Sequence, residues 1–202
     1  MAKAREVTKG EEDYIKENLW YDPETGYLWW SIRGVGRQFD KPLGHVDKDG
    51  YICVFINKFG KPWQPKAHRL AWFLYYGAWP ENQIDHTNGI KNDNRISNLR
   101  QATSAENNVN KSKQKLYKGQ PCSSQYKGVY WDRGGKKWRV GIRVNRRLIL
   151  LGYLDNEEEA ALAYNKAALE YFGEFAKINI IEPLDTGITN TYISSSSGEL
   201  TC

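Results

Sequence analysis

Three side chains in the middle of the chain have the types and spacing of a hydrolytic site with one metal ion. Asp85 and His86 are adjacent, and Asn107 lies 22 positions after Asp85. Asp85 offers a charged oxygen ligand and Asn107 a neutral one, which suits Mg²⁺ because this ion takes few protein oxygens and fills its other positions with water and phosphate. His86 has an ordinary pKa in the range for taking a proton from an attacking water. The metal would stabilise the charge that develops as a phosphate ester is cleaved.

The local sequence predicts a strand, a turn and a short helix that carry these residues. The Asp-His pair ends an expected strand, and Asn88-Gly89 behind it is a strong signal for a hairpin. Thr103 and Glu106 form a capping box, so we expect a helix to begin near residue 104. Asn107 would then lie in the first or second turn of that helix, beside the end of the strand.

A mainly β-structured scaffold is expected before this site. Residues 1–20 suit a short polar helix, residues 21–66 carry turn and strand signals, and residues 67–76 suit a second short helix. His68 and Arg69 stand at the start of this second helix. They have two interpretations, packing against the metal site or a role at the phosphate, and the sequence leaves both open.

Positive charge is concentrated in the middle of the chain. The 202 residues include 29 Lys and Arg against 24 Asp and Glu, a net charge of +5, whereas residues 61–150 alone carry 18 against 5. Clustered Lys and Arg indicate a polyanion partner, because they displace counterions from phosphate backbones. Residues 111–122 are basic and lack apolar periodicity, so we expect a linker. Its lysines either contact phosphates without specificity or are merely solvated: Lys111, Lys113 and Lys115.

Residues 123–182 predict a small sheet and one helix. The stretch 137–144 alternates basic and apolar side chains, which puts its basic residues on one face of a strand and its apolar residues on the other. Further strands are expected at 126–131 and 147–154. Asn156 then begins a helix whose alanines form an apolar stripe. The pattern is typical of a three-stranded antiparallel sheet backed by a helix.

The composition excludes several classes of protein. No apolar run approaches the ~18 residues that a membrane span needs, and the N-terminus lacks the apolar segment of a secretory signal. The cysteines are odd in number and far apart, which argues against a disulfide framework or a Cys-based zinc site. We therefore expect the protein to function in a reducing cytoplasm. The tail, residues 183–202, is expected to be disordered.

The central segment also resembles a known family. The matching stretches are His68-Arg69-Leu70, Asp85-His86, Asn88-Gly89, Asp93-Asn94-Arg95, Asn98-Leu99-Arg100 and Asn107. In these stretches residues 67–110 resemble the HNH homing endonucleases, in the branch where Asn replaces the last His, and the likeness extends upstream to about residue 20. The resemblance implies a ββα-metal fold, a divalent metal at Asp85 and Asn107, a general base at His86, and a structural role for Asn98. It also implies products with a 5′-phosphate and a 3′-hydroxyl.

A second resemblance covers residues 123–180. The matching stretches are Tyr126-Lys127-Gly128-Val129-Tyr130-Trp131, Trp138-Arg139-Val140, Ile142-Arg143-Val144, Leu151-Gly152-Tyr153 and several positions of the following helix, up to Phe172-Gly173-Glu174-Phe175-Ala176. They are similar to the Apetala-2/ethylene-response-factor (ERF) DNA-binding domain, which lays its sheet in the major groove. The resemblance implies that the side chains facing DNA are Tyr130, Arg139, Arg143 and Arg147, with Trp131 and Arg133 as additional contacts.

Together these observations predict an α+β protein that cuts double-stranded DNA. We expect a site-specific HNH homing endonuclease that uses Mg²⁺, with Mn²⁺ as the alternative. It is expected to have no membrane partner and to act in the cytoplasm of a bacterial host. Its gene would belong to a phage or mobile element. Whether it is a monomer or a homodimer, and whether it nicks or cuts both strands, stays open. The competing hypothesis is a non-catalytic DNA-binding regulator with a vestigial nuclease module. An RNA-binding protein is a weaker third hypothesis, because the sheet lacks ring pairs for stacking single strands.

The expected parts of the chain are an N-terminal helix (1–20), the HNH domain (21–110), the linker (111–122), the Apetala-2/ERF-type domain (123–182) and the tail (183–202).

Overall fold

A computed structural model describes residues 5–34, 37–57, 62–113, 115–117 and 119–181 of the chain. In this part of the chain, the strands form one three-stranded sheet and several two-stranded antiparallel pairs. The mixed α and β content agrees with the expected α+β class. The predicted tail lies outside the described residues.

The N-terminal part consists of two helices and four short strands. In chain order they are α1 (Lys9–Asn18), β1 (Leu19–Tyr21), β2 (Leu28–Trp30), β3 (His45–Val46), β4 (Ile52–Cys53) and α2 (Ala67–Tyr76). Thr8 and Glu11 form a capping box at the start of α1, which satisfies backbone N–H groups that a helix leaves unpaired. Both expected helices are present. The buried cluster of this part includes Ile15, Leu70 and Phe73, so α1 and α2 share one core.

The central segment, residues 83–110, carries the predicted chemistry. It contains β5 (Gln83–His86), the 3₁₀ turn η1 (Ile96–Asn98), β6 (Leu99–Ala102) and α3 (Ser104–Val109). β5 ends at His86 as expected, and the Thr103–Glu106 capping box begins α3. Asn88-Gly89 does not close a tight hairpin: β5 and β6 pair antiparallel, but the whole segment 87–98 connects them. The turn signal is real but local, since Gly89 has φ of 78° and its N–H donates to the His86 carbonyl at 2.8 Å.

The expected linker is partly structured. β7 (Leu116–Tyr117) pairs with β8 (Gln120–Pro121), and the N–H of Cys122 donates to the Lys115 carbonyl at 3.0 Å. Apolar periodicity could not reveal this hairpin, because its strands have two residues each. The stretch predicted as a linker therefore contains a short hairpin.

The C-terminal unit, residues 123–181, has the sheet and helix that the pattern predicts. β9 (Val129–Asp132), β10 (Lys137–Val144) and β11 (Arg147–Leu154) form a sheet in the order β11-β10-β9. α4 (Glu157–Phe172) packs on it through small alanines, and the 3₁₀ turn η2 (Gly173–Phe175) follows.

One contact shows how closely α4 and the sheet approach. Gly128 has φ of 79°, and a Cβ there would lie 1.9 Å from the Tyr164 ring. Only glycine fits between the start of β9 and the helix.

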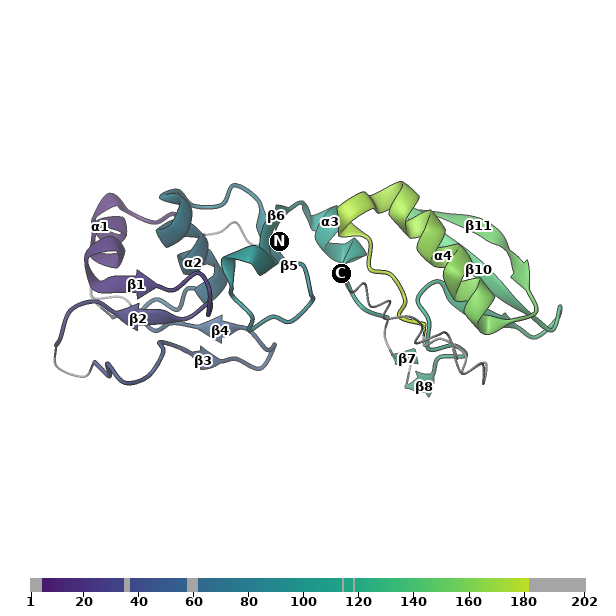
Figure 1. Ribbon diagram of the computed structural model, residues 1–202, viewed down its shortest axis with the longest axis horizontal. Helices are drawn as coiled ribbons and strands as arrows, with labels where there is room; N and C mark the ends of the chain where they lie inside the picture. The colour runs from purple at the N-terminus through teal and green to yellow at the C-terminus, as the bar shows by residue number, and fades with distance from the viewer. Residues whose placement is uncertain (1–4, 35–36, 58–61, 114, 118, 182–202) are drawn as a thin grey trace, which may run out of the picture.

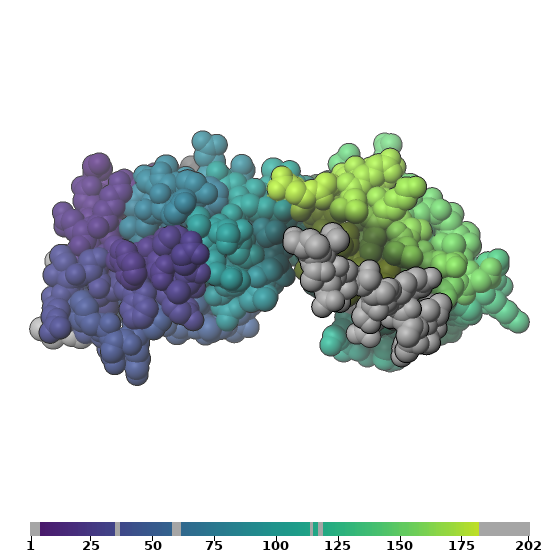
Figure 2. Space-filling model, viewed as in Figure 1, coloured from purple at the N-terminus to yellow at the C-terminus, as the bar shows by residue number. Residues whose placement is uncertain are grey.

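The elements follow one another along the long axis of the molecule. Figure 1 shows α1, α2 and β1 to β4 at one end, β5, β6 and α3 in the middle, and α4 with β10 and β11 at the other end. In Figure 2 the yellow-green segment that follows α4 meets the teal central segment. Separate buried clusters underlie the two ends. Among the described helices, none is both long and apolar enough to cross a membrane.

Candidate active site

Asp85 is held by a charged partner on the neighbouring strand. Asp85 on β5 stands directly opposite Arg100 on β6. The Arg100 Nε and Nη2 atoms donate to Asp85 Oδ2 at 3.0 and 2.9 Å. The carboxylate is 4% exposed, so this charge-assisted pair compensates for much of the solvation that Asp85 loses on burial. Arg100 thereby fixes the direction in which the carboxylate points.

Asn110 is a second partner of Asp85, which sequence reasoning missed. The buried Asn110 Nδ2 donates to Asp85 Oδ1 at 3.1 Å and Oδ2 at 3.0 Å, and to the His86 carbonyl at 2.8 Å. It ends α3, one helical turn after Asn107, so both asparagines face β5. The spacing of three positions between Asn107 and Asn110 was the signal in the sequence that could have identified Asn110.

His86 is buried and oriented by an amide. Its Nε2 lies 3.2 Å from Asn94 Oδ1, and the Tyr21 hydroxyl donates to the Asn94 carbonyl at 2.7 Å. Because an amide oxygen only accepts, Nε2 carries the hydrogen and Nδ1 is left to accept a proton. Burial lowers the pKa of His86, which keeps the imidazole neutral at neutral pH. Asn94 is thus a second group that sequence reasoning missed.

Asn107 lines the same cavity as the Asp-His pair. The other groups around this cavity include Tyr51, Lys91, Asn110 and Lys111. Asn107 Nδ2 donates to Gln83 Oε1 at 2.9 Å, so the side-chain carbonyl oxygen is the atom of Asn107 that could act as a metal ligand. The structure therefore brings the three predicted residues to one cavity.

Asn98 has the contacts of a loop-tying residue. Its Oδ1 accepts from the Asn88 N–H at 3.0 Å, and its Nδ2 donates to the Asp93 carbonyl at 2.8 Å. Both contacts lie within the loop that joins β5 to β6. They hold the loop that presents His86 and take no part in the cavity.

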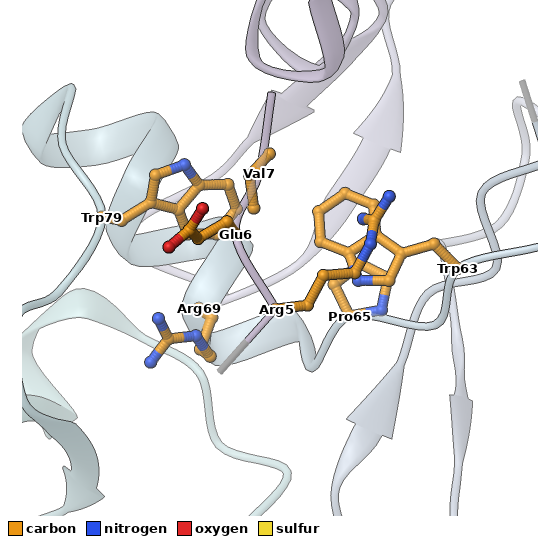
Figure 3. A pocket seen from close by; sticks show the side chains of 7 residues that line it. All are labelled: Arg5, Glu6, Val7, Trp63, Pro65, Arg69 and Trp79. Carbon is orange, nitrogen blue, oxygen red and sulfur yellow. The ribbon is translucent and has the colours of Figure 1, made fainter. Parts of the chain in front are cut away.

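His68 and Arg69 have different surroundings. His68 is 8% exposed and packs edge-on against His86, with ring centroids 5.2 Å apart. This geometry favours packing over contact with a phosphate. Arg69 lines a different pocket, beside Trp63 and Trp79 (Figure 3). Consecutive residues of a helix point about 100° apart, so α2 can direct only one of the two toward His86.

Comparisons with known proteins bear on this arrangement. The family model described as HNH endonuclease matches residues 66–109. An uncharacterised HNH endonuclease of Acanthamoeba polyphaga mimivirus, L560, is 33% identical over 140 residues, which cover 68% of this chain and 67% of that protein. The chain belongs to the HNH endonuclease family. It is therefore a hydrolase that cleaves DNA phosphodiester bonds.

Two further matches are more limited in extent. Another uncharacterised HNH endonuclease of the same virus, L247, is 32% identical over 101 residues, which cover 46% of this chain and 25% of that protein. A solved structure of the HNH homing endonuclease I-HmuI, which concerns DNA binding and cleavage, is 28% identical, covers 46% of this chain and 51% of that chain, and has a TM-score of 0.37.

The donor atoms of this HNH site fit a divalent cation. Asp85 Oδ1 accepts one hydrogen bond, from Asn110, whereas Oδ2 accepts three, so Oδ1 retains a lone pair. The Asn107 carbonyl oxygen is the second candidate ligand. Across the described residues, no three His, Cys, Asp or Glu side chains gather into a metal-binding group. A site of two protein oxygens completed by water and phosphate is typical of Mg²⁺.

The C-terminal sheet of the HNH chain divides the expected DNA-binding residues between its faces. Directly paired residues share a face, and Arg139 pairs with both Tyr130 and Tyr153. Arg143 lies on this same outward face, opposite Leu148. The outward face is exposed, with Tyr130 at 52%.

Arg147 lies on the other face, which corrects the expectation that it faces DNA beside Arg139 and Arg143. The two-residue turn Asn145-Arg146 pairs Arg147 with Val144, on the side of the buried Ile142. Trp131 pairs with Trp138 and also lies there. Arg133 is exposed in the turn after β9.

Two of the three predicted linker lysines keep exposed side chains. Lys111 is exposed and lines the active-site cavity, and Lys115 is exposed beside the C-terminal unit. The Lys113 ammonium donates to the carbonyls of Tyr126 and Val129 at 2.7 and 2.9 Å. Lys113 is therefore a structural anchor, and neither interpretation of the linker lysines describes it.

The burial of His68 predicts a loss of stability in acid. Burial lowers the pKa of His68 to about 3, and its Nδ1 has no hydrogen-bond partner within the described part of the chain. Below pH 6.5 the unfolded chain binds this proton and the folded chain does not, so stability falls as the pH falls. The slope is about 1.4 kcal/mol per pH unit, or about 2 kcal/mol between pH 6.5 and 5. Urea unfolding at pH 7.5, 6 and 5 should show a slope of at least this size, and His68→Phe should reduce it by this amount, while His86, whose pKa burial also lowers, retains its own contribution. Equal slopes in both proteins would contradict the assignment.

Proposed function

We propose that this HNH endonuclease is a site-specific, divalent-metal-dependent enzyme of the homing type. Mg²⁺ is the proposed metal and Mn²⁺ the alternative. The HNH domain, residues 21–110, cuts the DNA, and an Apetala-2/ERF-type domain, residues 123–182, holds it. What carries the proposal is that Asp85, His86 and Asn107 line one cavity, in which the imidazole is buried and neutral.

His86 acts as the general base. Its Nδ1 takes a proton from a water molecule, while Nε2–H remains on Asn94 Oδ1 and holds the ring in place. A lowered pKa keeps Nδ1 able to accept this proton at neutral pH. The imidazolium that forms is stabilised by the adjacent Asp85 carboxylate.

Asp85 and Asn107 hold the metal. When bound, the cation acts as a Lewis acid that stabilises negative charge on the phosphate and on the leaving oxygen. Arg100 and Asn110 keep the Asp85 carboxylate aimed at the cavity.

The reaction is hydrolysis of a phosphodiester bond. The water oxygen forms a bond to phosphorus as its proton moves to His86 Nδ1, and the bond between phosphorus and the 3′ oxygen breaks. The 3′ oxygen leaves as an alkoxide and takes a proton from a second water molecule, and His86 Nδ1 then returns its proton to solvent. The products therefore carry a 5′-phosphate and a 3′-hydroxyl. Exposed Lys91 and Lys111 at the cavity are placed to contact flanking phosphates.

A plasmid assay tests this function directly. Supercoiled plasmid that contains host DNA should be relaxed or linearised by the full chain in Mg²⁺ or Mn²⁺, and EDTA should stop the reaction. Mapping the ends should locate a recurrent cut site with 5′-phosphates. If the protein binds DNA but does not cut it in the presence of any divalent metal, the result would instead favour the non-catalytic regulator.

The outward face of the C-terminal sheet is proposed to bind the major groove. Arg139 and Arg143 project from β10 beside the exposed Tyr153 and Leu148 of β11. A two-stranded ribbon of this kind fits a groove about 12 Å wide. The glutamates that begin α4 are on the first turn of the helix that covers the other face, where phosphates would repel them less.

Two arginines provide a matched test of this face. Arg143→Ala should weaken binding to the cut site by about 1–3 kcal/mol, because a base or phosphate contact is lost. Arg147→Ala removes the same charge from the other face and should have a much smaller effect. Binding is measured by fluorescence anisotropy in EDTA, so that no cleavage occurs. Equal losses in the two variants would contradict the proposed face.

A further inference from the structure

The guanidinium that fixes Asp85 is itself fixed from outside the central segment. The Arg100 side chain is 14% exposed, and two of its nitrogens are used on Asp85. The third, Nη1, donates to the main-chain carbonyl of Glu174 at 2.6 Å. The guanidinium also lies over the Phe175 ring, 4.1 Å from its centroid. Glu174 and Phe175 belong to η2, in the C-terminal unit.

Phe175 is directed to this contact rather than to its own core. On either side of it, Phe172 and Ala176 pack against the C-terminal cluster. Phe175 between them is half-buried and covers Arg100. The charge of Glu174 adds little, because its carboxylate is 77% exposed and 3.8 Å from Arg100.

A second contact ties the same segment to the loop behind His86. The Lys177 ammonium donates to the Asn88 carbonyl at 3.4 Å and lies close to Gly89. The residues after α4 therefore reach both ends of the Asp85-His86 pair: Arg100 behind the carboxylate, and the turn that follows the imidazole.

We propose that Phe175 and the Glu174 carbonyl are positioning groups of the nuclease site, which hold Arg100 so that Arg100 can hold Asp85 toward the metal. The inference rests on the proposed role of Asp85 as a metal ligand. The C-terminal unit then contributes to metal binding and cleavage as well as to DNA binding. Outer groups that orient a metal ligand typically change metal affinity or activity by about 10- to 100-fold when they are removed.

The test is a metal titration of the full chain. Binding of Mn²⁺ is measured by calorimetry without DNA, and cleavage is measured as a function of metal concentration at saturating DNA. In Phe175→Ala, Mn²⁺ affinity should fall and the metal concentration for half-maximal cleavage should rise, each about tenfold or more. Phe175→Tyr keeps the ring over Arg100 and should restore both. Tyr171→Ala, which removes an exposed ring of α4, is the matched control and should change neither.

A double-mutant cycle separates positioning from simple loss of packing. Arg100→Lys keeps the charge but loses the guanidinium fork, so Phe175→Ala should add little in that background. Effects that multiply, or wild-type metal affinity in Phe175→Ala, would overturn the proposal. DNA affinity in EDTA should be unchanged, and a loss confined to it would also overturn the proposal.

The two proposals can fail separately. If the wild type neither binds metal nor cleaves, the proposed function fails, and the positioning role fails with it. If the wild type cleaves and His86→Ala does not, but Phe175→Ala titrates as the wild type does, only the positioning role is wrong.

Discussion

Replacing His86 by alanine should lower the turnover number for DNA cleavage by about 10²- to 10⁴-fold, the usual contribution of a positioned general base. The reason is geometric: His86 is the imidazole in the cavity, its Nε2 is engaged by Asn94, and Nδ1 is the atom left to accept a proton. DNA affinity in EDTA should stay close to that of the wild type, because the side chain is 4% exposed and cannot contribute much binding surface.

The chain supplies a matched control for that experiment. It has three histidines, and His45 is exposed on β3 and is not among the residues that line the cavity. His45→Ala should cleave at the wild-type rate. A His86→Ala variant that retains its fold by circular dichroism and cleaves within a fewfold of the wild type would contradict the general-base role.

The second large effect is expected for Asp85→Asn. The metal supplies several kcal/mol of charge stabilisation, and each 1.4 kcal/mol is tenfold in rate, so the loss of a charged ligand should lower cleavage by about a thousandfold or more. Asparagine keeps the shape of the side chain and an oxygen that can accept from Arg100. It therefore removes the charge with less disturbance than alanine, which would leave the guanidinium buried without its partner.

Two measurements make the Asp85 result specific. Calorimetric binding of Mn²⁺ should be lost together with activity. Asp155→Asn removes a carboxylate that is 81% exposed and pairs with Lys137, and it should leave both quantities unchanged. Wild-type metal affinity in Asp85→Asn would show that the cation is held elsewhere.

Local signals in the sequence predicted the elements that carry the site. The capping box of Thr103 and Glu106 begins α3, and Asn156 accepts from the N–H of Glu159 at the start of α4. The alternation along β10 places Arg139 and Arg143 on one face, as expected. Such predictions succeed because each depends on residues only a few positions apart.

Contacts between distant residues could not be predicted in the same way. Asn94, Arg100 and Asn110 are ordinary loop, strand and helix residues until the fold places them against His86 and Asp85. The position of Arg147 also depends on pairing, because a two-residue turn sets which face it shares with β10. The Phe175 contact joins residues 75 positions apart, and no local pattern encodes it.

The connection between the two parts of the chain has a consequence for where the enzyme cuts. The Lys127 ammonium donates to the carbonyls of Val109 and Lys111, at 2.5 and 2.8 Å, and Lys113 reaches back in the opposite direction. Because these hydrogen bonds run in both directions, they make the junction between the two parts rigid and not a flexible linker. Under the proposed function, a rigid junction sets the distance between the two DNA contacts. The scissile bond then lies a constant number of base pairs from the sequence that the sheet binds. Residues inserted between α3 and β9 should therefore spread the cuts over several positions relative to the bound sequence.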